Sequence, residues 1–239
     1  RPDIEIILHE ENMEKLPDTD AYFGFFPILD FYQKQYKWVH CIAAGVDKFL
    51  EKDMHPDTIF TRTIGQFGYQ IGTYVLSYLL ADVNLHDAYR KQQETKLYKP
   101  IQKTTLKEKT VVVFGTGEIG REIARILGML EARVLGISRS GKQAPYFDAV
   151  YETSVSKEIV KQADYIINIM PLTEETHKYF NADFFAHCKD TFFVNVGRGK
   201  SVDEAALLNA LNKQQVRMAI LDVQDTEPLP EDSWLWEDN

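Results

Sequence analysis

The chain has 239 residues, enough for one large domain or two small ones, and its 36 acidic residues outnumber its 27 basic ones to give a net charge of −9. This balance argues against a nucleic-acid partner, because nothing supplies a broad basic face for a phosphate backbone. No apolar stretch is long enough to span a membrane, and the two cysteines, Cys41 and Cys188, form no C-x-x-C pair that would suggest a metal site. We therefore expect a globular cytoplasmic protein with no metal, membrane or nucleic acid among its partners.

The first part of the chain contains three candidate strands, at residues 4–8, 21–26 and 36–42. Residues 68–89 carry apolar side chains at three- and four-residue spacing, which is typical of a helix. Residues 90–109 are rich in Lys, Gln and Thr with weak periodicity, so we interpret them as a linker with room for one short exposed element.

From Thr110 onward, strands and helices alternate regularly. An apolar stripe predicts a helix from Ile119 to Leu130, and Asn181 and Asp203 are placed to cap helices that end near Cys188 and Leu211. Strands are predicted at residues 111–114, 133–137, 149–151, 165–170, 191–196 and 218–223. Such alternation predicts an α/β fold whose parallel sheet is covered by helices on both faces.

A glycine-rich turn follows the strand at residues 111–114 directly. It reads Gly115-Thr116-Gly117-Glu118-Ile119-Gly120, which matches G-x-G-x-x-G between a strand and a helix. In this context the first glycine permits the tight turn, the second lets a pyrophosphate approach the backbone, and the third lets helix and strand pack closely. The alternative is a set of ordinary turn glycines. The motif in its full context predicts a doubly wound, Rossmann-type dinucleotide-binding domain over residues 73–239.

The end of the next strand indicates which dinucleotide is bound. An NAD-binding domain usually has an acidic residue here for the adenosine ribose, whereas this chain has Ser138, Arg139 and Ser140. A guanidinium pairs with a ribose phosphate and two hydroxyls can add hydrogen bonds, so we predict NADP(H) in preference to NAD(H). The alternative is a solvated loop with an incidental arginine.

Three later segments, read together behind the glycine turn, carry a family resemblance. They are residues 170–176, 195–199 and 221–230, with a further match at residues 38–47. In this order they resemble the D-isomer-specific 2-hydroxyacid dehydrogenases. The resemblance implies that residues 1–72 form a smaller, flavodoxin-like α/β substrate domain, incomplete in this chain because it lacks a first strand and a C-terminal return.

The resemblance also implies roles for individual residues. Arg198 matches the catalytic arginine, which holds the substrate carboxylate and polarises the carbonyl, and Glu227 matches the acidic partner of the catalytic histidine. The backbone N–H groups of Ala44 and Gly45 match the substrate-carboxylate site, and Asp222 matches the residue that holds the nicotinamide carboxamide. Further cofactor contacts are implied for Met170, Pro171, Leu172, Thr176, Val196 and Gly197. Without the motifs, Arg198 would be interpreted as a surface salt-bridge partner, Glu227 as an exposed loop glutamate and Asp222 as the cap of a strand.

The family's catalytic histidine lies downstream of the Glu-Pro-Leu-Pro turn, and no histidine follows Glu227 here. His177 beside two glutamates reads as a solvated side chain, and His40 reads as a packed or hydrogen-bonded one, so we assign the role to neither. We expect the catalytic histidine beyond Asn239; otherwise the chain cannot catalyse the reaction as the family does.

The leading hypothesis is an NADP(H)-preferring oxidoreductase that reduces a small 2-oxo acid to a D-2-hydroxy acid. The alternatives are a phosphoglycerate dehydrogenase-like enzyme, which would need extra cations for the substrate phosphate, and a non-catalytic, corepressor-like protein that senses the nucleotide. The resemblance further implies a homodimer formed through the cofactor domain.

Overall fold

The chain divides into two units, residues 1–66 and residues 67–239, in a computed structural model that describes residues 3–10 and 12–237. The predicted domain boundary at residue 72 falls within helix α1 (Gly68–Val83), which belongs as a whole to the second unit. Among the described residues, every helix is too short or too polar to cross a membrane.

The first unit is built on three parallel strands: β1 (Ala21–Gly24), β2 (Trp38–Cys41) and β3 (Ile59–Arg62). Two 3-10 helices, η1 (Phe31–Gln33) and η2 (Asp47–Phe49), connect them. One face packs into a small core formed by Leu16, Phe31, Tyr36, Val39, Cys41 and Phe49. Three strands in a row do not by themselves establish a flavodoxin-like order, so that part of the expectation stays a prediction.

Two details of this unit differ from the sequence predictions. Residues 4–8 are not a strand: their apolar side chains are exposed and they pair with neither edge of the sheet. Strand β3 was not predicted, and its register with β2 places Thr61 opposite His40.

The second unit contains a six-stranded parallel sheet in the order β6-β5-β4-β7-β8-β9. The strands are β4 (Thr110–Phe114), β5 (Arg133–Ser138), β6 (Ala149–Glu152), β7 (Tyr165–Asn168), β8 (Thr191–Asn195) and β9 (Val216–Leu221). The chain winds outward from β4 to β6, returns, and winds outward again from β7 to β9. This is the dinucleotide-binding strand order, and it confirms the predicted Rossmann-type fold. Ligands of such sheets bind at the carboxyl ends of the strands, where the order reverses between β4 and β7.

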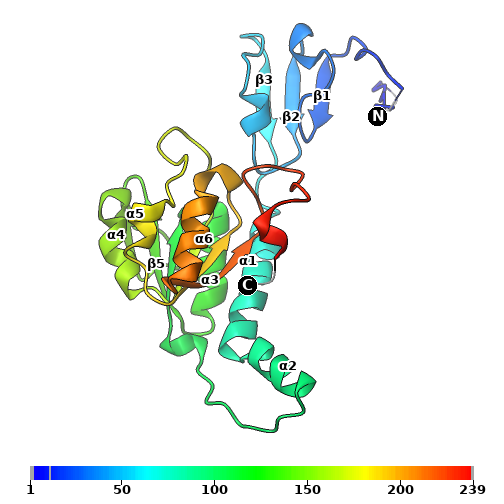
Figure 1. Ribbon diagram of the computed structural model, residues 1–239. Helices are drawn as coiled ribbons and strands as arrows, with labels where there is room; N and C mark the ends of the chain where they lie inside the picture. The colour runs from blue at the N-terminus through cyan, green and yellow to red at the C-terminus, as the bar shows by residue number, and fades with distance from the viewer. Residues whose placement is uncertain (1–2, 11, 238–239) are drawn as a thin grey trace. The chain divides into compact units, whose positions relative to one another are not determined.

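Helices cover both faces of this sheet (Figure 1). Helices α1 and α3 (Glu118–Gly128) pack on one face, around a core that includes Val75, Val113 and Val194. Helices α4 (Ser156–Ile159), α5 (Ala182–Phe185) and α6 (Glu204–Asn212) cover the other face, where Phe114, Phe184 and Phe193 are buried.

Helix boundaries follow local capping. The Asn181 side chain accepts a hydrogen bond from the Phe184 N–H, and the Asp203 side chain accepts one from the Ala206 N–H, so both predicted caps are confirmed. The predicted single helix at residues 68–89 instead breaks at Leu85, which has a left-handed φ of 59°, and continues as α2 (His86–Glu94). The remaining 3-10 helices are η3 (Leu106–Glu108), η4 (Thr153–Val155), η5 (Val160–Gln162), η6 (Gly199–Ser201) and η7 (Trp234–Trp236).

Candidate active site

The glycine turn after β4 has the geometry that a pyrophosphate needs. Gly115 has a φ of 109°, which favours glycine, and a Cβ on Gly120 would lie 1.9 Å from the Gly115 carbonyl oxygen. Gly117 is different: a Cβ there would point into open space, with no atom within 4 Å. The turn therefore requires Gly115 and Gly120 for its own packing. Gly117 instead leaves room for a ligand at the start of α3, where N–H groups and the helix dipole favour phosphate.

The end of β5 carries the residues predicted to recognise the adenosine ribose. The Ser138 hydroxyl oxygen is buried and has no hydrogen-bond partner among the described residues, which leaves it a donor for a ligand. Arg139 and Ser140 are exposed beside it. This arrangement fits a phosphorylated ribose, since the guanidinium can reach solvent-exposed phosphate oxygens.

The loop after β7 is ordered by its own side chains. The Thr176 hydroxyl donates to the Pro171 carbonyl over 2.7 Å and accepts from the Thr173 N–H over 2.7 Å. The side chain of Met170 is buried in the sheet core and that of Leu172 is half-buried. Met170 can therefore meet a cofactor only through its backbone, and Thr176 stabilises the loop itself.

The loops after β8 and β9 lie against each other. A Cβ on Gly199 would meet the Gln224 carbonyl oxygen at 1.8 Å, so only glycine lets the two backbones approach this closely. The Gln224 N–H in turn donates to a Glu227 carboxylate oxygen over 3.0 Å. Arg198 is half-buried, and its guanidinium donates to the Gly197 carbonyl over 2.7 Å. The two predicted catalytic residues thus come from adjoining loops of one sheet edge.

Val196 and Gly197, which precede Arg198, are both buried, and the Val196 side chain packs into the core on the α1 and α3 face. A Cβ on Gly197 would meet the Met170 carbonyl oxygen at 3.0 Å. The loops after β7 and β8 are therefore in backbone contact at this point.

Asp222 follows β9, and its N–H donates to the Asn195 carbonyl over 3.0 Å. Its exposed carboxylate interacts with the Tyr74 hydroxyl from α1, and the rings of Tyr74 and Tyr78 lie 5.0 Å apart, edge to face. Burial, then Tyr78, then the Asp222 charge raise the pKa of Tyr74, so this hydroxyl keeps its proton as a donor. Sequence reasoning missed Tyr74, because its spacing identified it only as one member of an apolar helix stripe.

In the first unit, the loop between β2 and η2 presents unused backbone donors. Among the described residues, the N–H groups of Ala44 and Gly45 have no acceptor, as a carboxylate site requires. The guanidinium of Arg62, at the end of β3, donates to the Ala44 carbonyl. One cation therefore lies beside this loop, and sequence reasoning missed Arg62 because it missed the strand that carries it.

The histidines make local contacts elsewhere. Both ring nitrogens of His40 bond to hydroxyls, of Thr61 and Thr63, over 2.8 and 3.1 Å, in agreement with its assignment as a hydrogen-bonded residue. His177 is exposed, as predicted. Within residues 3–10 and 12–237, no hydrogen bond or ion pair joins a histidine to Glu227.

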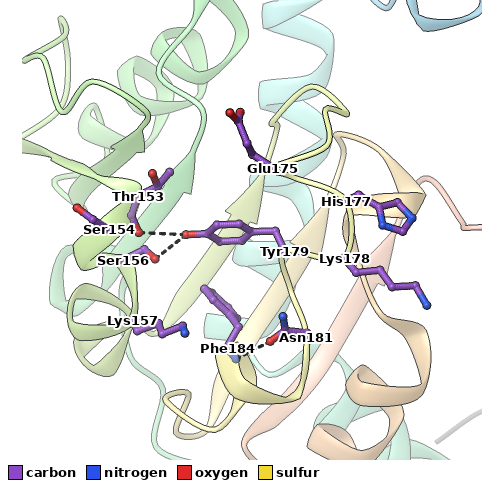
Figure 2. A pocket seen from close by; sticks show the side chains of 10 residues that line it. All are labelled: Thr153, Ser154, Ser156, Lys157, Glu175, His177, Lys178, Tyr179, Asn181 and Phe184. Atoms are coloured by element: carbon purple, nitrogen blue, oxygen red, sulfur yellow. Dashed lines mark hydrogen bonds between the residues drawn. The ribbon is translucent and has the colours of Figure 1, made fainter. Parts of the chain in front are cut away.

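A pocket of about 380 Å³ lies between the segment after β6 and the segment before α5 (Figure 2). Figure 2 shows the Tyr179 hydroxyl at its centre, bonded to the Ser156 hydroxyl over 2.6 Å and to the Thr153 carbonyl over 3.3 Å. Its lining includes none of the predicted site residues, and its Lys157 already pairs with Asp183. We therefore assign no ligand to this pocket.

Comparisons with known proteins agree with this geometry. The sequence profile described as "D-isomer specific 2-hydroxyacid dehydrogenase, NAD binding domain" matches residues 75–239. The chain is 30% identical to a glyoxylate/hydroxypyruvate reductase A of Salmonella heidelberg over 211 residues, which cover 85% of this chain and 68% of that protein.

Two solved structures are also similar. The first is a D-isomer specific 2-hydroxyacid dehydrogenase family protein from Aeromonas salmonicida, with 39% identity and a TM-score of 0.78 over 84% of this chain and 65% of that one. The second is an NADPH-dependent glyoxylate/hydroxypyruvate reductase from Sinorhizobium meliloti in complex with NADP and sulfate, with 26% identity and a TM-score of 0.85 over 92% of this chain and 72% of that one.

This chain therefore spans about two thirds of the length of these relatives. The profile match covers well over half of it and includes the glycine turn, Arg198 and Glu227. The chain belongs to the D-isomer specific 2-hydroxyacid dehydrogenase family, as its motifs predicted.

Proposed function

We propose that the full-length protein reduces a small 2-oxo acid to a D-2-hydroxy acid with a nicotinamide cofactor. The observation that carries this proposal is the contact between the loops of Arg198 and Glu227, which the close approach of Gly199 and Gln224 fixes at one edge of the sheet. A guanidinium can stabilise the oxyanion that develops as a 2-oxo acid is reduced, and a carboxylate can hold the protonated group that supplies the proton.

Each residue then has a chemical task. The bound cofactor supplies the hydride. Arg198 holds the substrate carboxylate with its paired N–H donors and stabilises the negative charge that develops on the carbonyl oxygen. Glu227, held by the Gln224 N–H, favours a protonated imidazole as its partner. We place that imidazole on a histidine downstream of Asn239, from which it donates the proton to the substrate oxygen.

The proposed cofactor is NADP(H). Its support is the sequence Ser138-Arg139-Ser140 without a carboxylate, together with the unpartnered Ser138 hydroxyl. The Sinorhizobium meliloti relative, which contains NADP, points the same way. The turn shaped by Gly115 and Gly120 would hold the pyrophosphate in the space that Gly117 leaves open, and Asp222, oriented by Tyr74, would hold the carboxamide.

The substrate is proposed to be a small acid such as glyoxylate, hydroxypyruvate or a branched 2-oxo acid. The free N–H groups of Ala44 and Gly45 suit its carboxylate, because small residues let a ligand reach the backbone. The names of the Salmonella and Sinorhizobium relatives support the first two substrates.

Arg62 favours a second candidate substrate. A guanidinium beside the Ala44 carbonyl is a cation that could pair with a phosphate, so 3-phosphohydroxypyruvate belongs in the assay as the substrate of a phosphoglycerate dehydrogenase-like enzyme.

We further propose a cytoplasmic homodimer formed through the second unit. Its support is the exposure of large apolar side chains on α1 and just after α2, namely Tyr69, Leu80, Leu97 and Tyr98, the last of which is 96% exposed. Light scattering on the wild-type protein and on Tyr98→Asp tests this proposal. We expect the wild-type protein to be a dimer and the substitution to weaken that dimer. A monomeric wild-type protein would contradict the proposal.

The test of the reductase is NADPH oxidation by the full-length protein with glyoxylate, hydroxypyruvate, 3-phosphohydroxypyruvate and 2-oxoisovalerate in turn. Turnover with at least one acid is expected, and Arg198→Ala should abolish it while NADPH binding persists. NADPH binding without turnover of any acid would refute the reductase and favour the corepressor-like alternative. Loss of NADPH binding in Arg198→Ala would mean that Arg198 contacts the cofactor instead.

A further inference from the structure

Three buried polar side chains link the loops after β7 and β8. Asn168 ends β7, Asn195 ends β8 and Ser201 ends η6, and all three are fully buried. Buried amides and hydroxyls are costly unless they are hydrogen-bonded, so a cluster of three requires an explanation.

The amide of Asn168 reaches both loops. Its nitrogen donates to the Asn195 side-chain oxygen and to the Ser201 hydroxyl, each over 2.8 Å. Its oxygen accepts from the Met170 N–H over 3.0 Å, at the start of the loop assigned to the cofactor. Both donors of the amide are therefore used within the cluster, and its acceptor fixes the cofactor loop.

The other two members hold the backbone around Arg198. The Arg198 carbonyl accepts from the Asn195 amide over 3.1 Å and from the Ser201 hydroxyl over 2.6 Å. The Asn195 side-chain oxygen also accepts from the Gly197 N–H over 3.1 Å. The side chains of Asn195 and Ser201 thus fix the backbone of Arg198, whose guanidinium is assigned to the substrate.

We propose that Asn168, Asn195 and Ser201 are positioning residues that hold the cofactor loop and Arg198 in one fixed arrangement. The inference rests on the proposed function, since it takes Met170 to lie against the cofactor and Arg198 to contact the substrate. Asn168 bonds to both sides, so a change at this residue reaches both loops, whereas a change at Ser201 reaches only the Arg198 side.

A purely structural role for the cluster is the competing explanation, and Thr191 provides a matched control. Its hydroxyl is also fully buried and donates to a backbone carbonyl, that of Ala163, over 3.1 Å. Thr191 begins β8 whereas Asn195 ends it, so the control lies at the opposite end of the sheet from the loops. Thr191→Val therefore removes a comparable buried hydrogen bond without touching them.

The experiment compares Ser201→Ala, Asn168→Ala and Thr191→Val in the full-length protein. Thermal unfolding, the NADPH dissociation constant from fluorescence, and kcat and KM for the 2-oxo acid are measured for each. Ser201→Ala is expected to lower kcat/KM for the acid at least tenfold while the NADPH dissociation constant stays within twofold. Asn168→Ala is expected to weaken NADPH binding at least fivefold and also to lower kcat/KM. Thr191→Val should lower the unfolding temperature but leave NADPH affinity, kcat and KM unchanged.

The outcomes separate this inference from the proposed function. A wild-type protein that binds NADPH but turns over no acid refutes the proposed function, and the NADPH affinity of Asn168→Ala still tests the cluster. The positioning role is overturned if Asn168→Ala matches Thr191→Val in NADPH affinity, whether or not the protein turns over an acid. Where turnover is measurable, it is also overturned if Ser201→Ala matches Thr191→Val in kcat/KM.

Discussion

Gly117→Ala should weaken NADPH binding without destabilising the folded protein. The backbone of Gly117 is extended, with φ −71° and ψ −163°, which alanine adopts without strain, and a Cβ there meets no atom within 4 Å. The folded protein should therefore accept the methyl group, and the lower entropy of the unfolded chain should stabilise it by about 0.4–1 kcal/mol. The same methyl group would occupy the space through which a pyrophosphate approaches the N–H groups at the start of α3.

The size of the expected effect follows from the bonds lost. Hydrogen bonds to a charged group contribute about 1.5–3 kcal/mol each. If the methyl group keeps the pyrophosphate from two of the N–H groups at the start of α3, the loss is at least about 3 kcal/mol. At about 1.4 kcal/mol per tenfold change, the NADPH dissociation constant should rise roughly a hundredfold or more.

Fluorescence titration with NADPH and thermal unfolding together make the assay. Gly128→Ala is the matched control, because Gly128 ends the same helix and its Cβ would also meet open space. It should leave NADPH binding unchanged. Unaltered NADPH affinity in Gly117→Ala would refute the assignment of the turn to the pyrophosphate, and unfolding of this variant would refute the reading of its geometry.

Three further predictions concern other parts of the second unit. Arg139→Ala should weaken NADPH binding roughly tenfold or more and leave NADH binding nearly unchanged, because one charge-assisted contact to the ribose phosphate is lost; equal losses for the two cofactors would contradict this. Burial raises the pKa of the Cys188 thiol to about 12, so a thiol reagent at pH 8 should modify it only after unfolding, and labelling of the native protein at the rate of a free thiol would contradict its burial. Asp82→Ala should lower the free energy of unfolding by about 2 kcal/mol in urea titration, because the partly buried Arg217 guanidinium and the Tyr165 hydroxyl both lose their carboxylate partner; a change below about 0.5 kcal/mol would show that this network does not stabilise α1 against the sheet.

The parts of this fold that were predictable depend on local sequence. The glycine turn, the Asn181 and Asp203 caps and the apolar strands of the second unit each have a short-range physical signature, and all appear in the structure. Residues 4–8 carry the same local strand signature, but they pair with no strand in the described part of the chain and form none. A strand needs a partner, which its own sequence does not supply.

The site follows the same division. Arg198 and Glu227 could be predicted because whole motifs surround them, whereas the roles proposed for Arg62, Tyr74 and Asn168 rest on contacts with distant residues. The hydrogen bond from Asn168 to Asn195, for example, joins residues 27 positions apart on neighbouring strands. Such pairs become visible only when the strand order is known.

The most direct test of the central claim is the chirality of the product made from hydroxypyruvate by the full-length protein with NADPH. Glyoxylate cannot serve, because its reduction product is achiral, whereas hydroxypyruvate gives glycerate as one of two enantiomers. We predict that chiral chromatography will show D-glycerate, formed in step with NADPH consumption and absent with Arg198→Ala. L-glycerate, or glycerate formed equally well by Arg198→Ala, would contradict the account.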